Sequence, residues 1–322
     1  MTTSLSIPVA AFKDVYDVSV VDRALNDLSP SASEVLRSLY EKMLKAGGAR
    51  LSVKPSGVPV LDELYDEVPN FAEVLDDIKK HIALCSSSND PLELPPMLLL
   101  GPPGIGKTHF CRRIAQLLAT GYGLVSMSSM TAGWILSGAS SQWKNAKPGK
   151  VFDTLLHGRY ANPVIVVDEI DKAGGESQYD PLGALYSLLE RDTASQFVDE
   201  FVEVPVDASS VVWIATANDE SRIPEPVLNR MNVYSIEAPD HEGSRRVAQM
   251  IYAEIRWGHD WGKSFPEAPA SLVLDRLAEM GPREMRRAIM NAFGGAKLAH
   301  RDEIQVDDVD GTRPQKKQRI GF

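Results

Sequence analysis

Short apolar runs alternate with amphipathic stretches through the middle of the chain. Residues 97–100, 164–167 and 211–215 are continuously apolar, which is typical of strands buried on both faces of a parallel sheet. Residues 123–128 suggest another strand. Between these runs, 107–118 and 151–156 have apolar residues at helical spacing, and an Asp-Pro pair at 180–181 suggests a helix to 189. Strands that alternate with helices predict an α/β domain with a parallel sheet.

The flanking regions have a helical pattern instead. We predict helices over 34–44, after a capping box at 31–34, and over 70–82, opened by Asn70. Residues 54–57 read as a linker. Beyond Asp240, helices are predicted over 241–257, 270–280 and 282–300, the last with Pro282 at its first position. The predicted domains are a helical N-terminal region of unknown role (1–56), a large α/β domain (57–239), a small helical domain (240–310) and a flexible basic tail (311–322).

Composition narrows the class of protein. The chain has 322 residues, of which 43% are hydrophobic, and a formal net charge of −10, so it is a poor non-specific binder of nucleic acid or anionic membranes. No signal peptide or membrane span is expected from the sequence. Cys85 and Cys111 form no disulfide framework, which favours a reducing cytoplasm. The six histidines have no metal-ligand spacing.

A glycine-rich turn joins the apolar run 97–100 to the amphipathic stretch 107–118. It fits the phosphate-binding pattern G-x-x-x-x-G-K-[ST] known as Walker A. Its backbone N–H groups and the start of the helix would hold a phosphate, with Lys107 reaching the β- and γ-phosphates and Thr108 coordinating Mg²⁺. We therefore predict ATP and Mg²⁺ as cofactors. The predicted nucleotide-binding residues here are Gly101, Pro102, Pro103, Gly104, Ile105, Gly106, Lys107, Thr108 and His109.

Polar residues follow two of the predicted buried strands. Asp168 and Glu169 come directly after 164–167, and Asn218 comes after 211–217. Ligands of parallel sheets bind beyond the carboxyl ends of the strands. Asp168 would hold Mg²⁺, Glu169 would activate the attacking water, and Asn218 would contact the γ-phosphate or orient that water. The alternatives are an acidic turn and a turn asparagine, but the upstream Walker A motif favours the functional interpretation of the acidic pair.

The order of these motifs resembles that of AAA+ ATPases. After Walker A and Asp168–Glu169 come Asn218, Arg230 and the triplet Gly281–Pro282–Arg283. In finer detail, residues 57–300 resemble the ATPase module of Lon proteases, most closely at 162–171, 180–185, 197–204, 215–218 and 223–230. This resemblance implies an αβα P-loop domain, a small helical lid and a ring, usually of six subunits. It also implies that Asn218 is sensor 1, Arg230 is an arginine finger reaching a neighbour, and Arg283 is a nucleotide-contacting sensor 2. Without it, both arginines read as solvated surface residues.

The chain also departs from the Lon pattern. Lon continues into a protease domain with a serine–lysine dyad, whereas this chain stops about twenty residues after the lid, so we expect no intrinsic protease activity. Residues 140–150 resemble the Lon pore loop. Trp143, followed by Lys144, stands where the family has an aromatic that grips polypeptide, and Asn145 replaces the usual Gly. The alternative for Trp143 is a core tryptophan. The terminal 320–322 resembles a peptidase-docking tripeptide, but a frayed end is the favoured interpretation.

Three functions are compatible with these residues. The first is a ring-forming ATPase that remodels or threads polypeptide, alone or for a separate partner protein. The second is a nucleic-acid loader or translocase in which Lys144, Lys147 and Lys150 contact phosphates. The third, a nucleotide-binding scaffold without turnover, is disfavoured because every hydrolysis residue is present. The net charge and the Lon-like pore loop favour the first.

Overall fold

The computed structural model describes residues 8–30, 33–129, 133–143, 145–173 and 180–310. Their contacts divide the chain into two units. The first contains the residues up to 60 together with 73–101 and 107–235, and the second contains 61–72, 102–106 and the residues from 236 onward. Each unit has a hydrophobic core of its own. In the part of the chain that is described, no helix is long and apolar enough to cross a membrane.

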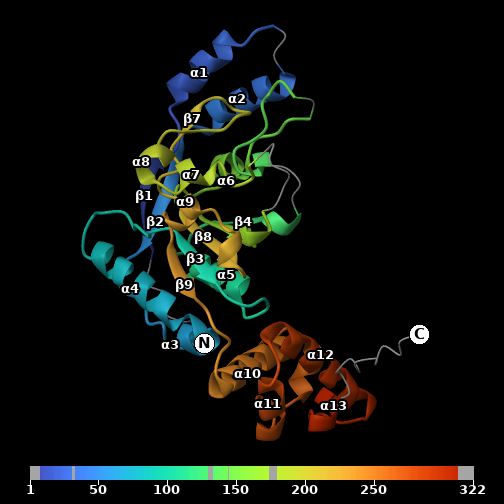
Figure 1. Cartoon of the computed structure of the whole chain (residues 1–322). Coiled ribbons are helices and arrows are strands. Elements are labelled where there is room, and N and C mark those ends of the chain that lie inside the picture. The colour runs from blue at the N-terminus through green and yellow to red at the C-terminus, as the bar shows by residue number, and fades with distance from the viewer. Residues whose placement is uncertain (1–7, 31–32, 130–132, 144, 174–179, 311–322) are drawn as a thin grey trace. The chain divides into compact units, whose positions relative to one another are not determined.

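A five-stranded parallel sheet organises the first unit (Figure 1). The strand order is β4-β5-β8-β3-β9. All of β8 and the first four residues of β5 are buried, as the continuous apolar runs predict, so the α/β class is confirmed. The strands are β3 (Met97–Leu100), β4 (Tyr122–Ser126), β5 (Val164–Asp168), β8 (Val212–Ala217) and β9 (Asn232–Ser235).

Helices flank this sheet. Helix α5 packs against β5 and β8, and α6 packs against β4. Tyr234 of β9 donates its hydroxyl to Asp77 Oδ2 of α4 at 2.6 Å, which ties that helix to the edge strand. The helices that belong with the sheet are α4 (Ala72–Ser86), α5 (Lys107–Leu117), α6 (Lys150–His157), α7 (Leu185–Leu188), α8 (Arg191–Ala194) and α9 (Glu225–Leu228).

Two predicted helices are shorter than expected. The helix expected from Asp180 begins only at Leu185, because the Asp180 carboxylate accepts the Leu182 N–H at 2.9 Å and holds a turn instead. The sequence also predicts a short helix over 226–230, whereas helix α9 ends at Leu228, so Arg230 follows the helix rather than lying on it.

The N-terminal segment belongs to the first unit and contains strands as well as the expected helix. Strands β1 (Pro8–Asp14) and β2 (Ala49–Pro55) pair antiparallel, so residues 54 and 55 end a strand rather than form a linker. Helices α1 (Val18–Asp27) and α2 (Glu34–Ala46) lie between them, and Gly47, at φ 68°, ends α2. The predicted capping box begins at residues 31 and 32, which lie outside the described residues.

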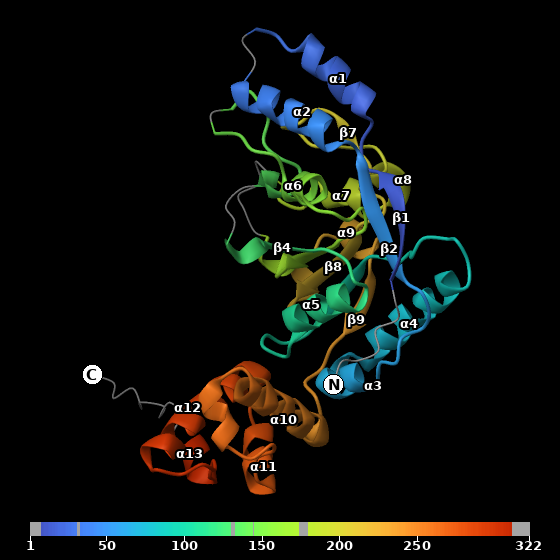
Figure 2. The same ribbon diagram turned by 180° about the vertical axis from the view of Figure 1, so that it is seen from behind.

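A short hairpin anchors α2 to the rest of the unit. It consists of β6 (Phe197–Val198) and β7 (Pro205–Val206), and α2 lies beside β7 in both views (Figures 1 and 2). Tyr40 of α2 donates its hydroxyl to the Val202 carbonyl at 2.6 Å.

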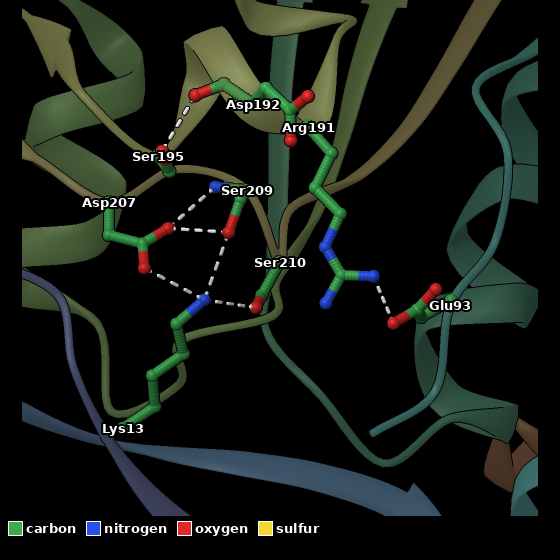
Figure 3. A network of polar contacts seen from close by, with 8 residues as sticks. All are labelled: Lys13, Glu93, Arg191, Asp192, Ser195, Asp207, Ser209 and Ser210. Carbon is green, nitrogen blue, oxygen red and sulfur yellow. Dashed lines mark hydrogen bonds and ion pairs between the residues drawn. The ribbon is translucent and has the colours of Figure 1, made fainter. Parts of the chain in front are cut away.

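A polar network joins β1 to the segment that precedes β8 (Figure 3). Lys13 Nζ lies 3.0 Å from Asp207 Oδ2 and donates to the hydroxyls of Ser209 and Ser210 at 3.0 and 2.7 Å. In the same view, Arg191 of α8 pairs with Glu93 in the loop before β3. Because these segments precede β3 and β8, the network lies at the amino end of the sheet, opposite the edge where ligands are expected.

The second unit is helical, as predicted. The three expected helices are present, and Pro282 takes the first position of its helix. Tyr252 and Phe265 pack against Phe293, with ring centroids 5.0 and 4.7 Å away. The helices are α3 (Asp62–Glu67), α10 (His241–Trp257), α11 (Ser271–Ala278), α12 (Pro282–Leu298) and α13 (Val306–Asp310).

Asn70 has a different role from the expected cap. A 3₁₀ turn (Pro69–Phe71) precedes α4, and the Asn70 amide donates to the carbonyls of Ile105 and Glu237 at 3.3 and 3.1 Å. These contacts hold the glycine-rich turn of residues 102–106 within the second unit.

Candidate nucleotide site

The glycine-rich turn between β3 and α5 has the backbone that its motif requires. Gly104 and Gly106 have φ of 84° and 100°, a left-handed region that residues with a Cβ rarely adopt. A Cβ on Gly104 would meet no atom within 4 Å, so glycine is needed here for backbone conformation rather than for space. Such a turn, leading into the start of a helix at Lys107, suits a phosphate.

Lys107 lies at the carboxyl ends of β3 and β8. Its Nζ donates to the Gly101 carbonyl at 2.5 Å and to Asn218 Oδ1 at 2.9 Å. Burial lowers the pKa of Lys107, while the carboxylates of Asp171, Asp168 and Glu169 act to raise it. The lysine is therefore a buried cation surrounded by acidic groups, and a polyphosphate would supply the charge that burial leaves poorly solvated.

Asp168 is the centre of a second set of contacts. Its Oδ1 accepts the Thr216 hydroxyl at 2.6 Å and the Thr108 hydroxyl at 3.2 Å. Carboxylate and hydroxyl oxygens are ligands that Mg²⁺ prefers, and Mg²⁺ usually takes only one or two of them from protein beside water and phosphate. The pair Thr108 and Asp168 therefore fits the predicted metal.

Glu169 follows β5 in an unusual conformation. Its φ and ψ are 55° and 49°, the left-handed region that is uncommon for residues other than glycine. The Glu169 N–H donates to the Thr216 hydroxyl at 3.0 Å. Strained backbone of this kind is frequent at functional sites.

The other predicted site residues are placed differently. Arg230 Nε lies 2.7 Å from Glu190 Oε1, and its Nη1 donates to the Pro226 carbonyl at 2.7 Å; no contact that we observe among the described residues joins it to Lys107 or Asp168. His109 is exposed on α5, and Arg283 is exposed in the first turn of α12, in the second unit.

Sequence reasoning missed two residues at this edge. Thr216 and Asp171 are 1% and 4% exposed, and both Asp171 oxygens have no hydrogen-bond partner among the described residues, although Lys172 Nζ lies 3.5 Å from Oδ2. The signal for Thr216 was available, since it is the polar residue within an otherwise apolar buried strand. Asp171 gave no such signal, because it follows the strand among other acidic residues.

The loop of residues 137–150, called the Trp143 loop below, carries the predicted pore-loop residues. Trp143 is 45% exposed and contacts Trp134 edge-on, with ring centroids 5.4 Å apart. Both indoles line a cavity of about 540 Å³. Asn145 has φ 66°, which explains how asparagine can replace glycine there, since asparagine tolerates the left-handed region. Lys144 lies outside the described residues.

The side chain of Asp199 contacts both ends of this loop, at Gly138 and Gly149. Its buried carboxylate accepts the backbone N–H groups of Gly149, Phe201 and Val202 at 2.7, 2.9 and 3.2 Å. Gly138 lies against it with φ 79°, and a Cβ there would come within 2.4 Å of Asp199 Oδ1. Burial raises the pKa of Asp199 to about 6, although the three N–H groups act to lower it.

Comparison with known proteins agrees with this geometry. Residues 97–237 match the model of the ATPase family associated with various cellular activities (AAA). The chain therefore contains an AAA ATPase domain, built on the sheet and the glycine-rich turn described above.

The relatives identify the kind of AAA domain. The chain is 32% identical over 297 residues to a mitochondrial Lon protease homologue of Emericella nidulans, covering 90% of this chain and 26% of that protein. It is 31% identical over 238 residues to the Lon protease of Clostridium beijerinckii, covering 71% and 30%. The chain thus contains an AAA domain that resembles the ATPase module of Lon proteases, and it spans about a quarter to a third of the length of these relatives.

A solved structure supports the fold. A variant of RuvB from Thermotoga maritima superposes with a TM-score of 0.51 at 16% identity, covering 80% of this chain and 71% of that one. At this identity the likeness concerns the fold alone.

Proposed function

We propose that this chain hydrolyses ATP with Mg²⁺. Its subunits would form a ring, usually of six subunits in this family, that remodels or threads a polypeptide. The observation that carries the ATPase proposal is the convergence of Lys107, Asp168 and Asn218 at the carboxyl ends of β3, β5 and β8. Bound Mg²⁺ would neutralise charge on the transferring phosphoryl group. Thr108 and Asp168 would hold it, and Glu169 would accept a proton from the attacking water.

The ring is proposed from Arg230. Its guanidinium pairs with Glu190 within its own subunit, while the residues that would bind and hydrolyse ATP lie at the carboxyl ends of β3, β5 and β8. An arginine finger supplied by a neighbouring subunit would complete the site, as the Lon resemblance implies. Specific activity would then depend on assembly.

Mixing two variants that are each inactive tests this arrangement. Arg230→Ala and Glu169→Gln should each be inactive alone, and a mixture of the two should regain activity, because some interfaces then combine an intact Glu169 with an intact Arg230. Arg222→Ala removes an exposed arginine nearby in the sequence, which pairs with Asp219 at 3.4 Å, and should retain wild-type activity. Full activity of Arg230→Ala alone, or of a strictly monomeric protein, would contradict the proposal.

The polypeptide substrate is proposed from the Trp143 loop. An exposed indole in a polar loop offers apolar surface that can bind chain segments with little regard to their sequence. The cavity that Trp134 and Trp143 help to line adds room for a substrate side chain. A separate partner protein and a cytoplasmic location belong to the same proposal.

The nucleic-acid alternative relies on lysines in this loop. Lys150 Nζ is ion-paired with Asp153 at 3.1 Å, which leaves less positive charge for phosphates than the sequence suggests. Single-stranded DNA and RNA should therefore bind weakly. Tight binding that weakens steeply with salt would favour the alternative.

A further inference from the structure

Thr216 makes two contacts that join the two acidic residues after β5. Its hydroxyl donates to Asp168 Oδ1 at 2.6 Å and accepts the backbone N–H of Glu169 at 3.0 Å. A threonine hydroxyl has one hydrogen to donate and lone pairs to accept, so both functions are used. The residue is 1% exposed, and therefore water does not compete for either bond.

The second contact replaces a bond of the sheet. Strands β5 and β8 pair in register up to Val167 and Ala215, after which the chain leaves the sheet. Glu169 then adopts its left-handed conformation, in which its N–H is turned to the threonine hydroxyl instead of a strand carbonyl. The hydroxyl thus compensates an N–H that would otherwise lack a partner at a strained position.

We propose that Thr216 is a positioning residue for hydrolysis. It fixes the carboxylate of Asp168 and the backbone of Glu169 through one hydroxyl, and so sets the metal ligand and the water-activating residue relative to each other. This inference rests on the roles proposed above for Asp168 and Glu169.

Two substitutions of similar size separate the hydroxyl from the packing. Thr216→Val keeps the shape and removes the hydroxyl, so we expect turnover to fall about tenfold or more, since a buried carboxylate and an N–H each lose a partner. Thr216→Ser keeps the hydroxyl and should restore turnover to within about threefold of wild type, the range left by small changes in packing. Thr120→Val is the matched control, because its hydroxyl donates to the Asn162 carbonyl at 2.9 Å, next to the start of β4 at the other end of the sheet.

A binding measurement supplies a readout other than activity. Titration of Mg²⁺ into each variant with a fluorescent ATP analogue should show that Thr216→Val needs several-fold more Mg²⁺ for half-maximal tightening, because Asp168 is less well oriented. Affinity for the analogue without Mg²⁺ should stay within about threefold of wild type, since Lys107 and the glycine-rich turn are untouched.

Three results would overturn the inference. These are wild-type turnover and Mg²⁺ dependence in Thr216→Val, an impairment of Thr216→Ser as large as that of Thr216→Val, and the same loss in Thr120→Val. Failure of the proposed function is recognised separately, because wild type itself would then hydrolyse no ATP or Glu169→Gln would be fully active.

Discussion

The nucleotide site and the Trp143 loop are each organised by one buried polar side chain, but the two side chains contact different partners. At the carboxyl end of the sheet, Thr216 contacts the side chain of Asp168, which ends the adjacent strand β5, and the backbone of Glu169, which follows it. In the loop, Asp199 accepts backbone N–H groups, one of them from Gly149, fifty residues earlier in the chain. Every residue except proline offers the same backbone N–H and C=O groups. A site built from side chains is therefore visible in a sequence, and a loop held through its backbone is not.

Removal of the carboxylate of Glu169 tests the first half of this comparison and should have the largest effect. Glu169→Gln keeps the shape and loses the base, so kcat should fall roughly 100- to 10,000-fold, as for other general bases. Nucleotide binding should persist, as measured by fluorescence titration. Glu220→Gln, at an exposed glutamate after β8, is the control. Wild-type turnover in Glu169→Gln would remove the proposed role.

Truncation of Trp143 tests whether the loop works independently of the nucleotide site. Trp143→Ala should leave basal ATPase activity and the melting temperature nearly unchanged, and should abolish stimulation by an unfolded polypeptide such as casein. The exposed Trp257 gives a control variant, Trp257→Ala. A loss of stability of about 3–5 kcal/mol, typical of a core aromatic, would show that Trp143 is structural.

The pH dependence of stability, compared between wild type and Asp199→Asn, tests how the Trp143 loop is held. An acid whose pKa is raised by burial, here to about 6, stabilises the fold most when it is protonated, and this contribution is lost as the pH rises through 6. The stability of wild type relative to Asp199→Asn should therefore fall by about 1–3 kcal/mol between about pH 4 and pH 7. Urea unfolding at several pH values measures this difference. Parallel pH profiles for the two proteins would show that Asp199 does not titrate in this way.

The smallest effect is expected at Asn145. Because its φ is 66°, Asn145→Ala should cost about 1 kcal/mol through left-handed strain, whereas Asn145→Gly should change stability by less than about 0.5 kcal/mol. Thermal unfolding of the two variants gives the comparison. Equal stability of the alanine and glycine variants would be inconsistent with a left-handed residue at this position.

The strands and helices that the sequence predicted well share a physical cause. The β5 and β8 segments are buried on both faces and so consist of unbroken apolar residues. By contrast, β9 was missed because it is short, exposed at three of its four positions, and defined by its pairing with β3. Pairing of β1 with β2 was missed for a related reason, since the two strands are joined only through the intervening helices.

The residues of the site also fall into those that the sequence predicted and those that it did not. Lys107, Thr108, Asp168 and Asn218 were predictable because phosphate and metal chemistry requires those residue types at the start of the helix and at strand ends. The structure brings Lys107 within hydrogen-bond distance of Asn218, and Thr108 within hydrogen-bond distance of Asp168. Their chemical roles remain predictions, as do those of Glu169, Arg230 and Arg283. Thr216 was detectable as the polar residue of an apolar strand, but its partners and those of Asp199 were not, because these contacts exist only after the strands and the hairpin are assembled.

The central position of β8 has a consequence for hydrogen exchange. Its backbone is paired on both sides, with β5 and β3, and all six of its residues are buried. Its amide protons should therefore exchange with solvent only when the whole first unit unfolds. Because the second unit has a separate core, its helices should reach a different exchange limit. Deuterium uptake would then report two opening free energies, and the strand that carries Thr216 and leads into Asn218 would mark the slower limit of the first unit.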